Sequence, residues 1–302
     1  MISSDDLQLI TVLAQEKSLV GVSRILNVSA SAISQRLGAL ENKLDLKIAE
    51  RVGRSGIILS AEGNYLASRG KDILNDISLL NDDVFKRKGQ LTGELHVIAS
   101  MGFGRLYIAP MLARFEEIYP EVKIKLTLSD QLGRIPNENW DILIRVEPLR
   151  DSTLRMKKLA SNKRILCASP DYIARFGEPV RPHDLTQHQC ITIFEDNEDT
   201  TLWRFSSKNG DKEDTRISPH FSCNDGEVAL SWALAGKGII LRSEWSVTSH
   251  IRSGKLIPLL SKWFTQEAPI IALTNGPKKR TERVQRLLDY LYKEVGIIIS
   301  KA

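Results

Sequence analysis

Five polar side chains lie close together at the start of one predicted helix, and their chemistry suits contacts with the edges of DNA bases. They are Ser29, Ser31, Ser34, Gln35 and Arg36. Hydroxyl and amide groups can form hydrogen bonds with base edges, and an arginine can reach a guanine or a phosphate. Gly38 lies on the same side and would allow a partner to approach the helix backbone closely. The pattern predicts a DNA-contacting face, with an ordinary solvated helix face as the alternative.

The apolar residues around this face predict two short helices joined by a tight turn. On the second helix, apolar residues recur at spacings of four, three and four, which is the period of one helix face. They are Ile33, Leu37, Leu40 and Leu44. Residues 27–29, Asn-Val-Ser, should separate the helices because Asn and Ser side chains bond to nearby backbone groups. Ser29 is then a suitable N-cap for the second helix, whose polar side we expect to face outward.

Residues 46–59 predict a two-stranded wing that turns at 53–56 and carries Arg51 and Arg54. Over residues 17–54, seven Lys and Arg side chains accompany three Asp and Glu side chains, so the local net charge is +4 of the chain's +5. Such a concentration of positive charge is expected next to phosphates. We therefore expect Arg51 and Arg54 to contact a DNA backbone, although either could be a solvated surface charge.

One long helix is predicted over residues 61–88. Its apolar positions repeat at heptad-like spacing, which favours pairing with another helix. They are Leu66, Ile73, Ile77, Leu80 and Val84. The helix would span roughly 40 Å at 1.5 Å per residue. We expect it to pair with its copy in a second chain, and the alternative is that it packs on its own domain.

From Leu91 onward, strand-like runs alternate with helices. The predicted strands are 94–100, 122–128, 141–146, 164–169, 189–194, 238–241 and 268–273, and the predicted helices are 105–118, 226–235 and 278–295. Alternation of this kind predicts a mainly parallel sheet covered by helices. About 210 residues is large for one sheet. The expected fold class is therefore an α/β region of two lobes that follows the helical N-terminal region.

A turn after the first of these strands, Gly102-Phe103-Gly104, invites a dinucleotide-binding interpretation. Tyr107 occupies the third glycine position, and Asp130 lies 28 residues beyond Gly102, further than the usual spacing of about 20. The sequence contains no nucleophile elbow, P-loop or zinc-protease motif. Its five histidines lack ligand spacing. These patterns predict no enzyme, no cofactor and no metal site, although a small-residue turn that opens a helix can hold an anion.

Composition and charge indicate a globular protein with 42% hydrophobic and 26% charged residues. No apolar run approaches the roughly 18 residues that a membrane span needs. The N-terminus carries acids where a signal peptide would carry positive charge. Cys167, Cys190 and Cys223 are an odd set without a secretory signal, so we expect buried thiols, with a redox switch between two of them as the alternative. We therefore expect a cytoplasmic protein that does not contact membranes.

The whole layout resembles the LysR-type transcriptional regulators of bacteria. The motifs that carry the resemblance are DLQLITVLAQEKSL, NVSASAIS, QRLGALENKLDLKIAER, LSAEG, RFEEIYPEVKIKL, WDILIRV, LCASPDYIARFG and ALAGKGI. It implies an N-terminal all-α winged helix-turn-helix domain (1–60), a dimerising linker helix (61–90) and a C-terminal effector domain (91–302). The last resembles periplasmic binding proteins, with lobe I at 91–163 plus 262–302 and lobe II at 164–261. The CASPDYIARFG segment is similar to regulators of dicarboxylate utilisation, which favours an organic acid as effector.

The resemblance also places effector contacts in a cleft between the two lobes. The positions that it indicates are Ser100, Gly102, Phe103, Ser129, Arg145, Asn224 and Asp225. Ser100 and Ser129 could bond a carboxylate, and Arg145 could form a bidentate, directional contact with one. The equally weighted alternative for Arg145 is a structural pair with a nearby acid such as Glu147.

Residues and resemblance together predict a sequence-specific transcription regulator whose two recognition helices enter successive major grooves. A cleft-bound metabolite would act through its different affinities for two lobe arrangements. The expected partners are double-stranded DNA, a small carboxylate effector, further copies of the chain in a homodimer or homotetramer, and RNA polymerase. The rival hypothesis is a solute-binding module whose DNA-binding domain has lost its function, and such a protein would show no salt-dependent DNA affinity.

Overall fold

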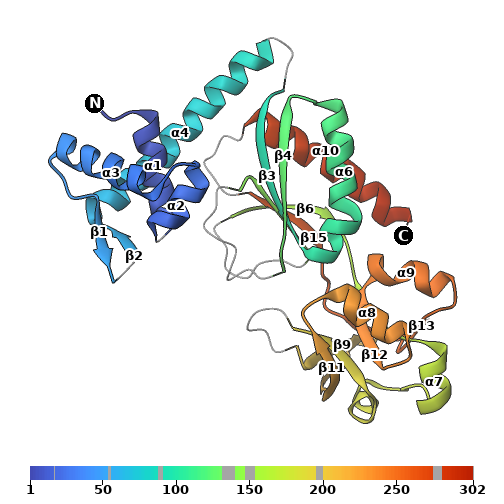
Figure 1. The fold of residues 1–302 in the computed structure, drawn as a ribbon. Helices are drawn as coiled ribbons and strands as arrows, with labels where there is room; N and C mark the ends of the chain where they lie inside the picture. Colours follow the sequence, from blue (N-terminus) through green and yellow to red (C-terminus); the bar gives the residue numbers. More distant parts are fainter. Residues whose placement is uncertain are drawn as a thin grey trace. The chain divides into compact units, whose positions relative to one another are not determined.

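The chain folds into two compact units, of which the first is Met1–Thr92 and the second contains most of the remaining residues (Figure 1). The computed structural model describes residues 1–16, 18–53, 56–87, 91–130, 140–146, 154–194, 200–274 and 281–301. No helix in this part of the chain combines the length and the apolar character that a membrane span requires. Each unit has its own set of buried apolar side chains.

The first unit is a winged helix-turn-helix followed by one long helix (Figure 1). Its elements are α1 (Ser4–Gln15), α2 (Leu19–Leu26), α3 (Ala30–Leu44), β1 (Ala49–Val52), β2 (Gly56–Leu59) and α4 (Ala61–Arg87). Strands β1 and β2 are antiparallel, with Ala49 opposite Leu59 and Val52 opposite Gly56. The predicted helix-turn-helix and wing are thus confirmed, with the turn at residues 27–29 and both strands within 46–59.

The core of the first unit explains the predicted apolar spacing on α3. Ile33, Leu37 and Leu40 are buried, and Leu44 packs against the same core at partial burial. They meet apolar side chains of α1 and α2. These are Leu9, Ile10, Val12, Leu13 and Val22. Burial of one face of α3 leaves its polar side outward, which is the arrangement that the spacing predicts.

The apolar residues of helix α4 form two groups, one packed against the first unit and one exposed. Leu66 packs against the core of the first unit, and the helix also lies against α1, where Gly70 is next to Leu7. Further along, four apolar side chains of the predicted seam are exposed by 40–63%. They are Ile73, Ile77, Leu80 and Val84. The first turns therefore pack on the unit itself, as the alternative predicted, and the later turns present an apolar stripe, while pairing with a second chain stays a prediction.

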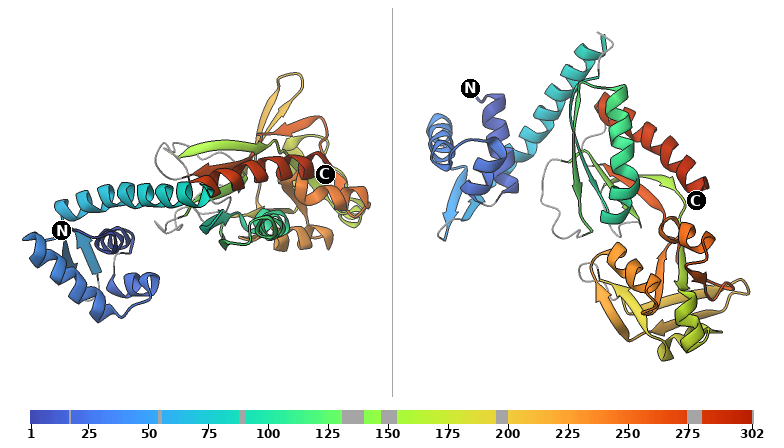
Figure 2. Two further views of the ribbon diagram at one scale, coloured as in Figure 1. Left: turned by 90° about the horizontal axis from the view of Figure 1, so that it is seen from above. Right: turned by 45° about the vertical axis from the view of Figure 1, so that its right-hand side comes forward.

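The first sheet of the second unit has five strands in the order β4-β3-β5-β15-β6. The strands are β3 (Gly93–Ala99), β4 (Val122–Leu128), β5 (Ile142–Val146), β6 (Arg155–Ala160) and β15 (Ile270–Thr274). The chain leaves β3 through α5 (Met101–Phe103), a π-helical turn η1 (Gly104–Ile108) and α6 (Ala109–Ile118). Helix α10 (Glu282–Lys301) lies beside α6, with Phe115 and Tyr290 ring centroids 5.4 Å apart (Figure 2). We call this part lobe I.

Lobe II contains a second five-stranded sheet in the order β11-β8-β12-β7-β13 and a smaller sheet in the order β10-β9-β14. The strands are β7 (Arg164–Ala168), β8 (Cys190–Ile193), β9 (Leu202–Ser207), β10 (Lys212–Arg216), β11 (Pro219–Cys223), β12 (Ile239–Ser243), β13 (Ile257–Pro258) and β14 (Trp263–Thr265). The helices are α7 (Pro170–Phe176), the 3-10 helix η2 (Pro182–Gln187), α8 (Gly226–Leu234) and α9 (Glu244–Arg252).

Each five-stranded sheet is mainly parallel, as expected, with four strands in one direction and one strand against them. In lobe I, β3 runs parallel to β4 and β5, but β15 runs antiparallel to β5 and β6. In lobe II, β8 is parallel to β11 and β12, whereas β7 is antiparallel to β12 and β13. The antiparallel strands arise where the chain crosses between the lobes and enters the other sheet from the opposite end. Residues 263–265, expected in lobe I, instead pair with β9.

Candidate nucleic-acid interface and effector site

The turn between α2 and α3 is formed by the residues that the sequence indicated. Asn27 ends α2 in the left-handed region, with φ of 53°, and its backbone N–H donates to the Ser23 carbonyl. Asn adopts this conformation more readily than most residues. Ser29 then caps α3, because its Oγ accepts a hydrogen bond from the Ala32 N–H at 3.2 Å. The same Oγ lies 2.9 Å from Ser31 Oγ, so the cap and the first outward hydroxyl are linked.

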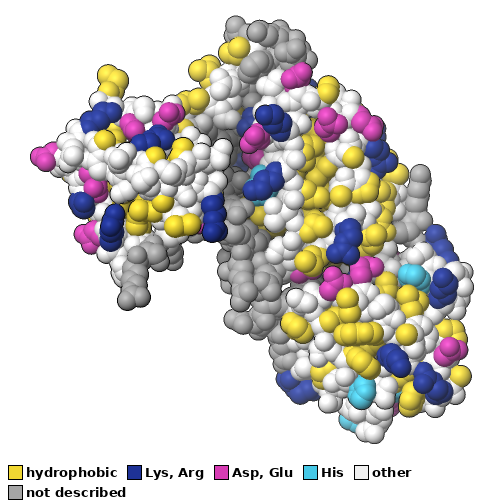
Figure 3. Space-filling view, in the orientation of Figure 1, with side chains coloured by type: hydrophobic (Ala, Val, Ile, Leu, Met, Phe, Trp, Pro, Cys, Tyr) yellow, Lys and Arg dark blue, Asp and Glu magenta, His cyan; other side chains and the backbone are white. Residues whose placement is uncertain are grey.

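The outward side of α3 is accessible. Ser31 and Gln35 are exposed, and Ser34 and Gly38 are partly exposed. A Cβ built on Gly38 would meet no described atom within 4 Å. On the face of the first unit that Figure 3 shows, Lys and Arg side chains are interspersed with acidic ones. The hydroxyl and amide groups that were predicted to meet DNA therefore lie where a duplex can reach them.

Two of the three predicted basic contacts lie within the described residues, and they differ in their surroundings. Arg51 extends from β1 of the wing, and its Nη2 donates to Ser34 Oγ at 3.4 Å. Arg36 is turned toward the first turn of α1, where its Nη2 donates to the Asp5 carbonyl at 3.3 Å. Arg54 lies outside the described residues. The structure thus brings Arg51 to the outward side of α3, whereas Arg36 lies at its flank.

Glu41 fixes α3 to the start of the wing. Its Oε1 accepts hydrogen bonds from the Ile48 N–H at 2.9 Å and the Ala49 N–H at 3.2 Å, and its Oε2 lies 2.9 Å from Lys47 Nζ. Partial burial acts to raise the pKa of Glu41, but these hydrogen bonds and the Lys47 charge outweigh it and hold the pKa below its ordinary value. The ionised carboxylate therefore sets the position of the wing relative to α3.

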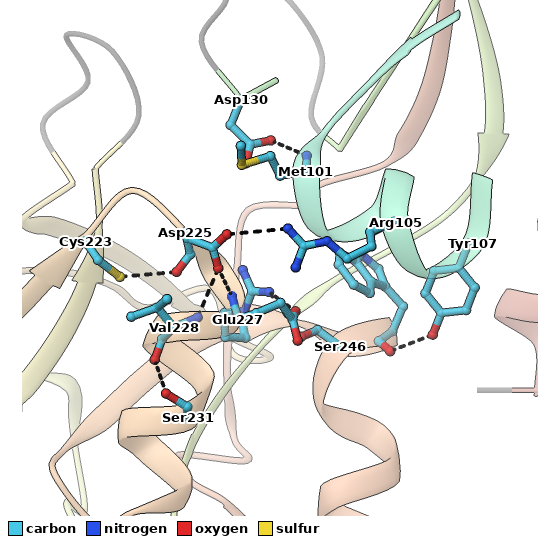
Figure 4. A network of polar contacts seen from close by, with 12 residues as sticks. Met101, Arg105, Tyr107, Asp130, Cys223, Asp225, Glu227, Val228, Ser231 and Ser246 are labelled. Carbon is cyan, nitrogen blue, oxygen red and sulfur yellow. Dashed lines mark hydrogen bonds and ion pairs between the residues drawn. The ribbon is translucent and has the colours of Figure 1, made fainter. Parts of the chain in front are cut away.

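In lobe I, neighbouring strand ends bring predicted effector residues together. Ser100 follows β3, and its N–H donates to the Ile144 carbonyl of β5 at 3.2 Å. Ser129 follows β4, and its N–H donates to the Ala99 carbonyl at 3.0 Å. The helix that starts after Ser100 uses its first amide within the chain, because the Met101 N–H donates to Asp130 Oδ1 at 2.9 Å (Figure 4). The Asp130 carboxylate therefore already binds the amide that the small-residue turn would offer to an anion.

The other predicted effector residues are distributed between interior and surface. Phe103 is only 1% exposed, and its ring lies 5.1 Å from that of Tyr107. Arg145 is buried in β5, and Glu147 lies outside the described residues. Asn224 is exposed, and the Asp225 carboxylate caps α8 by accepting from the Glu227 and Val228 amides at 2.8 and 3.0 Å. Phe103 and Arg145 are therefore packed side chains in this arrangement of the lobes.

Sequence reasoning missed a polar network that joins the two lobes (Figure 4). Arg105 Nη2 lies 3.9 Å from Asp225 Oδ2, and the Tyr107 hydroxyl donates to the Trp245 carbonyl at 3.1 Å. Arg242 Nη2 donates to Ser246 Oγ at 3.1 Å and lies 3.5 Å from Glu227 Oε1. One signal could have revealed Arg242, because it follows the apolar run 238–241 as a charged residue at a strand end, as Arg145 does in its own strand.

Among the described residues, the remaining titratable and thiol groups form no metal centre. In the described part of the chain, no group of three or more His, Cys, Asp or Glu side chains is placed to hold a metal ion. All three cysteines are free thiols. Burial raises the pKa of Cys167 and of Cys190 to about 12, whereas Cys223 is partly exposed. Buried thiols of this kind are inert packing groups.

A winged helix-turn-helix joined to a two-lobed α/β domain is the architecture of a ligand-responsive transcription regulator. The profile of the bacterial regulatory helix-turn-helix protein, lysR family, matches residues 4–64, and that of the LysR substrate binding domain matches residues 88–296. The chain belongs to the LysR family of bacterial transcription regulators, with its DNA-binding domain and its effector-binding domain.

Relatives and solved structures agree with this assignment over nearly the whole chain. The transcriptional activator TtdR of Escherichia coli K12 is 31% identical over 286 residues, which are 95% of this chain and 91% of TtdR. The regulator DmlR of the same strain is 31% identical over 287 residues, 95% of this chain and 92% of DmlR. The structure of CrgA, a LysR-type transcriptional regulator from Neisseria meningitidis, aligns with a TM-score of 0.61 at 29% identity, covering 98% of this chain and all of CrgA. The full-length Vibrio cholerae virulence activator AphB aligns with a TM-score of 0.63 at 25% identity, covering 97% and 99%.

Proposed function

We propose that this regulator reads its operator through the outward side of α3. Ser29, Ser31, Ser34, Gln35 and Arg36 would lie in the major groove, and Arg51 and Arg54 would contact phosphates. The observation that carries the proposal is the division of α3 into a buried apolar side and an exposed side of hydroxyl and amide groups. The Arg51–Ser34 contact supports it, because it places a wing cation beside the groups that would reach the bases.

The exposed stripe on α4 supports a homo-oligomer. Ile73, Ile77, Leu80 and Val84 recur at heptad-like spacing and lie on the surface of the first unit. Pairing two copies would bury these side chains and would present two recognition helices to successive half-sites. We propose a homodimer or a homotetramer in which residues 1–60 bind DNA, 61–90 pair the chains and 91–302 bind the effector. As a DNA-binding regulator it would act in the cytoplasm, with RNA polymerase as a further partner.

The effector proposal is a small organic acid bound between the lobes, and Ser100, Ser129 and Asn224 are the accessible predicted contacts. Gly102 lies two residues after Ser100, and because it has no side chain, nothing projects from the helix at this position. Asp225 and Asp130 already engage groups of the chain, so a carboxylate would have to compete with them. Phe103 and Arg145 would reach it only after a rearrangement of their packing.

Mapping the genomic fragments that the full-length protein binds, with and without a C4 dicarboxylate such as malate or tartrate, tests this function. We expect a pseudo-palindromic sequence shared by the bound fragments, an affinity that falls steeply with salt, and a shift in footprint on addition of the acid. A protein that binds an organic acid but no DNA at any salt concentration would instead support the solute-binding alternative.

A further inference from the structure

Trp245, in the first turn of α9, is the point at which lobe II meets the helix that follows β3. The rings of Phe103 and Tyr107 pack edge-on against the Trp245 ring, with centroid distances of 5.3 and 5.7 Å. A Cβ built on Gly102 would lie in van der Waals contact with the indole, 3.4 Å from Trp245 Cη2. The Tyr107 hydroxyl also donates to the Trp245 carbonyl. Trp245 is therefore covered by lobe I in this arrangement.

The indole N–H of Trp245 is buried in this contact without a hydrogen-bond acceptor. The residue is 8% exposed, its Nε1 is shielded from solvent, and no described atom accepts its proton. Trp203 shows the usual arrangement, because it is buried to a similar degree, at 7% exposure, and its Nε1 donates to the Thr200 carbonyl at 3.2 Å. Buried donors nearly always find a partner, so an exception at a lobe boundary points to a group that arrives from outside the chain.

The charges beside Trp245 indicate the chemistry of that group. Arg242 lies with its Cζ 5.8 Å from the centre of the Trp245 ring. Gly226 makes room for this guanidinium, since a Cβ at that position would collide with it. Acids are also near, because Glu227 lies 3.5 Å from Arg242. A donor N–H next to a guanidinium suits an acceptor oxygen, and best a carboxylate oxygen that can share Arg242 with Glu227.

We propose that the Trp245 indole N–H binds a carboxylate oxygen of the effector and couples that contact to the closing of the two lobes. This inference rests on the proposed function. Trp245 is not among the strand-end residues that were predicted to contact the effector. When the lobes separate, the N–H meets water. When they close without an effector, the N–H loses water and gains no acceptor, so closure is disfavoured. An effector that supplies the acceptor removes this cost of closure. It therefore favours the closed arrangement by the free energy that is recovered.

Trp245→Phe tests the coupling because it removes the N–H and keeps an aromatic ring, and Trp203→Phe is the matched control. Pulsed electron paramagnetic resonance would measure the inter-lobe distance in the full-length protein. Spin labels at Glu121→Cys in lobe I and Lys237→Cys in lobe II, both exposed positions, would be placed in a Cys223→Ser background. The two buried cysteines should not react with the label. Labelled protein mixed with excess unlabelled protein removes distances between copies.

Without any added ligand, we expect Trp245→Phe to shift the distance distribution toward the closed arrangement, while Trp203→Phe leaves it as in the parent. Trp245→Phe should also unfold at a higher temperature than Trp203→Phe, because only the latter strands a buried carbonyl. Identical distance distributions in the parent and in Trp245→Phe would overturn the proposal. An equal fall in unfolding temperature for both variants would do the same, because it would show that the Trp245 N–H has a partner.

Added malate or tartrate separates this inference from the effector proposal. We expect either acid to shorten the inter-lobe distance in the parent and to bind at least tenfold more weakly to Trp245→Phe than to Trp203→Phe. If an acid binds the parent and both variants equally, the assignment of Trp245 is wrong while the effector class stands. If neither acid acts on the parent but the ligand-free shift occurs, the effector class is wrong while the role of Trp245 in closure stands.

Discussion

Arg51 of the wing donates a hydrogen bond from Nη2 to Oγ of Ser34, 3.4 Å away on the outward side of α3. The contact joins two parts of the proposed interface, one that would meet phosphates and one that would meet base edges. A duplex lying against α3 would have to meet the Arg51 guanidinium at the same time, because the two side chains are neighbours. The Ser34 hydroxyl is also oriented by this bond before any DNA is bound.

Replacing Arg51 with Ala should weaken binding to all DNA sequences alike. A phosphate contact releases one counterion, so the slope of log affinity against log salt should become smaller by about one. Affinities measured at several salt concentrations, on an operator and on unrelated DNA, check this expectation. Arg204→Ala removes the same charge from an exposed site in lobe II and should change nothing. An unchanged salt slope in Arg51→Ala would assign that side chain a purely structural role.

Replacing Arg36 with Ala should relax the sequence preference while leaving the affinity for unrelated DNA nearly unchanged. The loss of one good base contact amounts to about 1–3 kcal/mol of discrimination. Gel shifts with an operator and with single-base variants of it would measure the preference. Equal preference before and after the change would mean that the bond to the Asp5 carbonyl, which holds α1 against α3, is the role of Arg36.

Glu41→Ala should destabilise the first unit by about 2 kcal/mol, since it strands two amides and removes a charged acceptor. Because the pKa of Glu41 is lowered in the folded protein, its contribution is complete above its ordinary value of 4.5 and is lost as the pH falls below that value. The variant should therefore differ from the parent at pH 7 and approach it in acid.

Circular dichroism must follow this transition, because all five tryptophans lie in the second unit and their fluorescence does not report on the first. Glu50→Ala, at an exposed position of β1, serves as the control and should unfold like the parent. Equal stability of Glu41→Ala and Glu50→Ala at neutral pH would show that the wing does not depend on the Glu41 carboxylate.

Gly38→Ala should raise stability and lower DNA affinity together. Glycine inside a helix costs roughly 1 kcal/mol relative to alanine, and no described atom stands in the way of a Cβ at this position. On the proposed interface, however, that Cβ would hold the helix away from the groove and lengthen the neighbouring contacts. Gly296→Ala on α10 is the matched control, because its Cβ would also meet nothing, and it should raise stability without affecting DNA binding. Undiminished affinity in Gly38→Ala would remove position 38 from the contact surface.

The parts of the molecule that follow from local sequence pattern were predictable. The buried side of α3 and the turn at Asn27 are encoded within a few residues, and both are found as expected. Strands β9 and β10 were missed because polar residues such as Lys212 and Asp214 interrupt the apolar alternation that marks a strand. The single antiparallel strand of each five-stranded sheet, β7 or β15, was not predicted, because its direction depends on how the chain crosses between the lobes, which no local pattern records.

The effector region was predicted only in part for a related reason. Ser100 and Ser129 meet because each follows a strand of one parallel pair, and strand-end logic captures such pairs. The contact of Tyr107 with Trp245 joins residues 138 positions apart, and neither side chain carries a sequence signal for the other. Phe103 was placed in the cleft from its position in the chain, but its apolar ring packs into the protein interior.

The affinity of Gln35→Ala for an operator tests most directly whether the outward side of α3 reads DNA. A duplex selected from a random library by the full-length parent protein serves as the operator, and Gln8→Ala, an exposed glutamine on α1, serves as the control. We predict that Gln35→Ala binds the selected duplex roughly 5- to 150-fold more weakly, as expected for one bidentate base contact, while its affinity for unrelated DNA and all affinities of Gln8→Ala stay unchanged. An equal affinity of the two variants for the selected duplex would contradict the account.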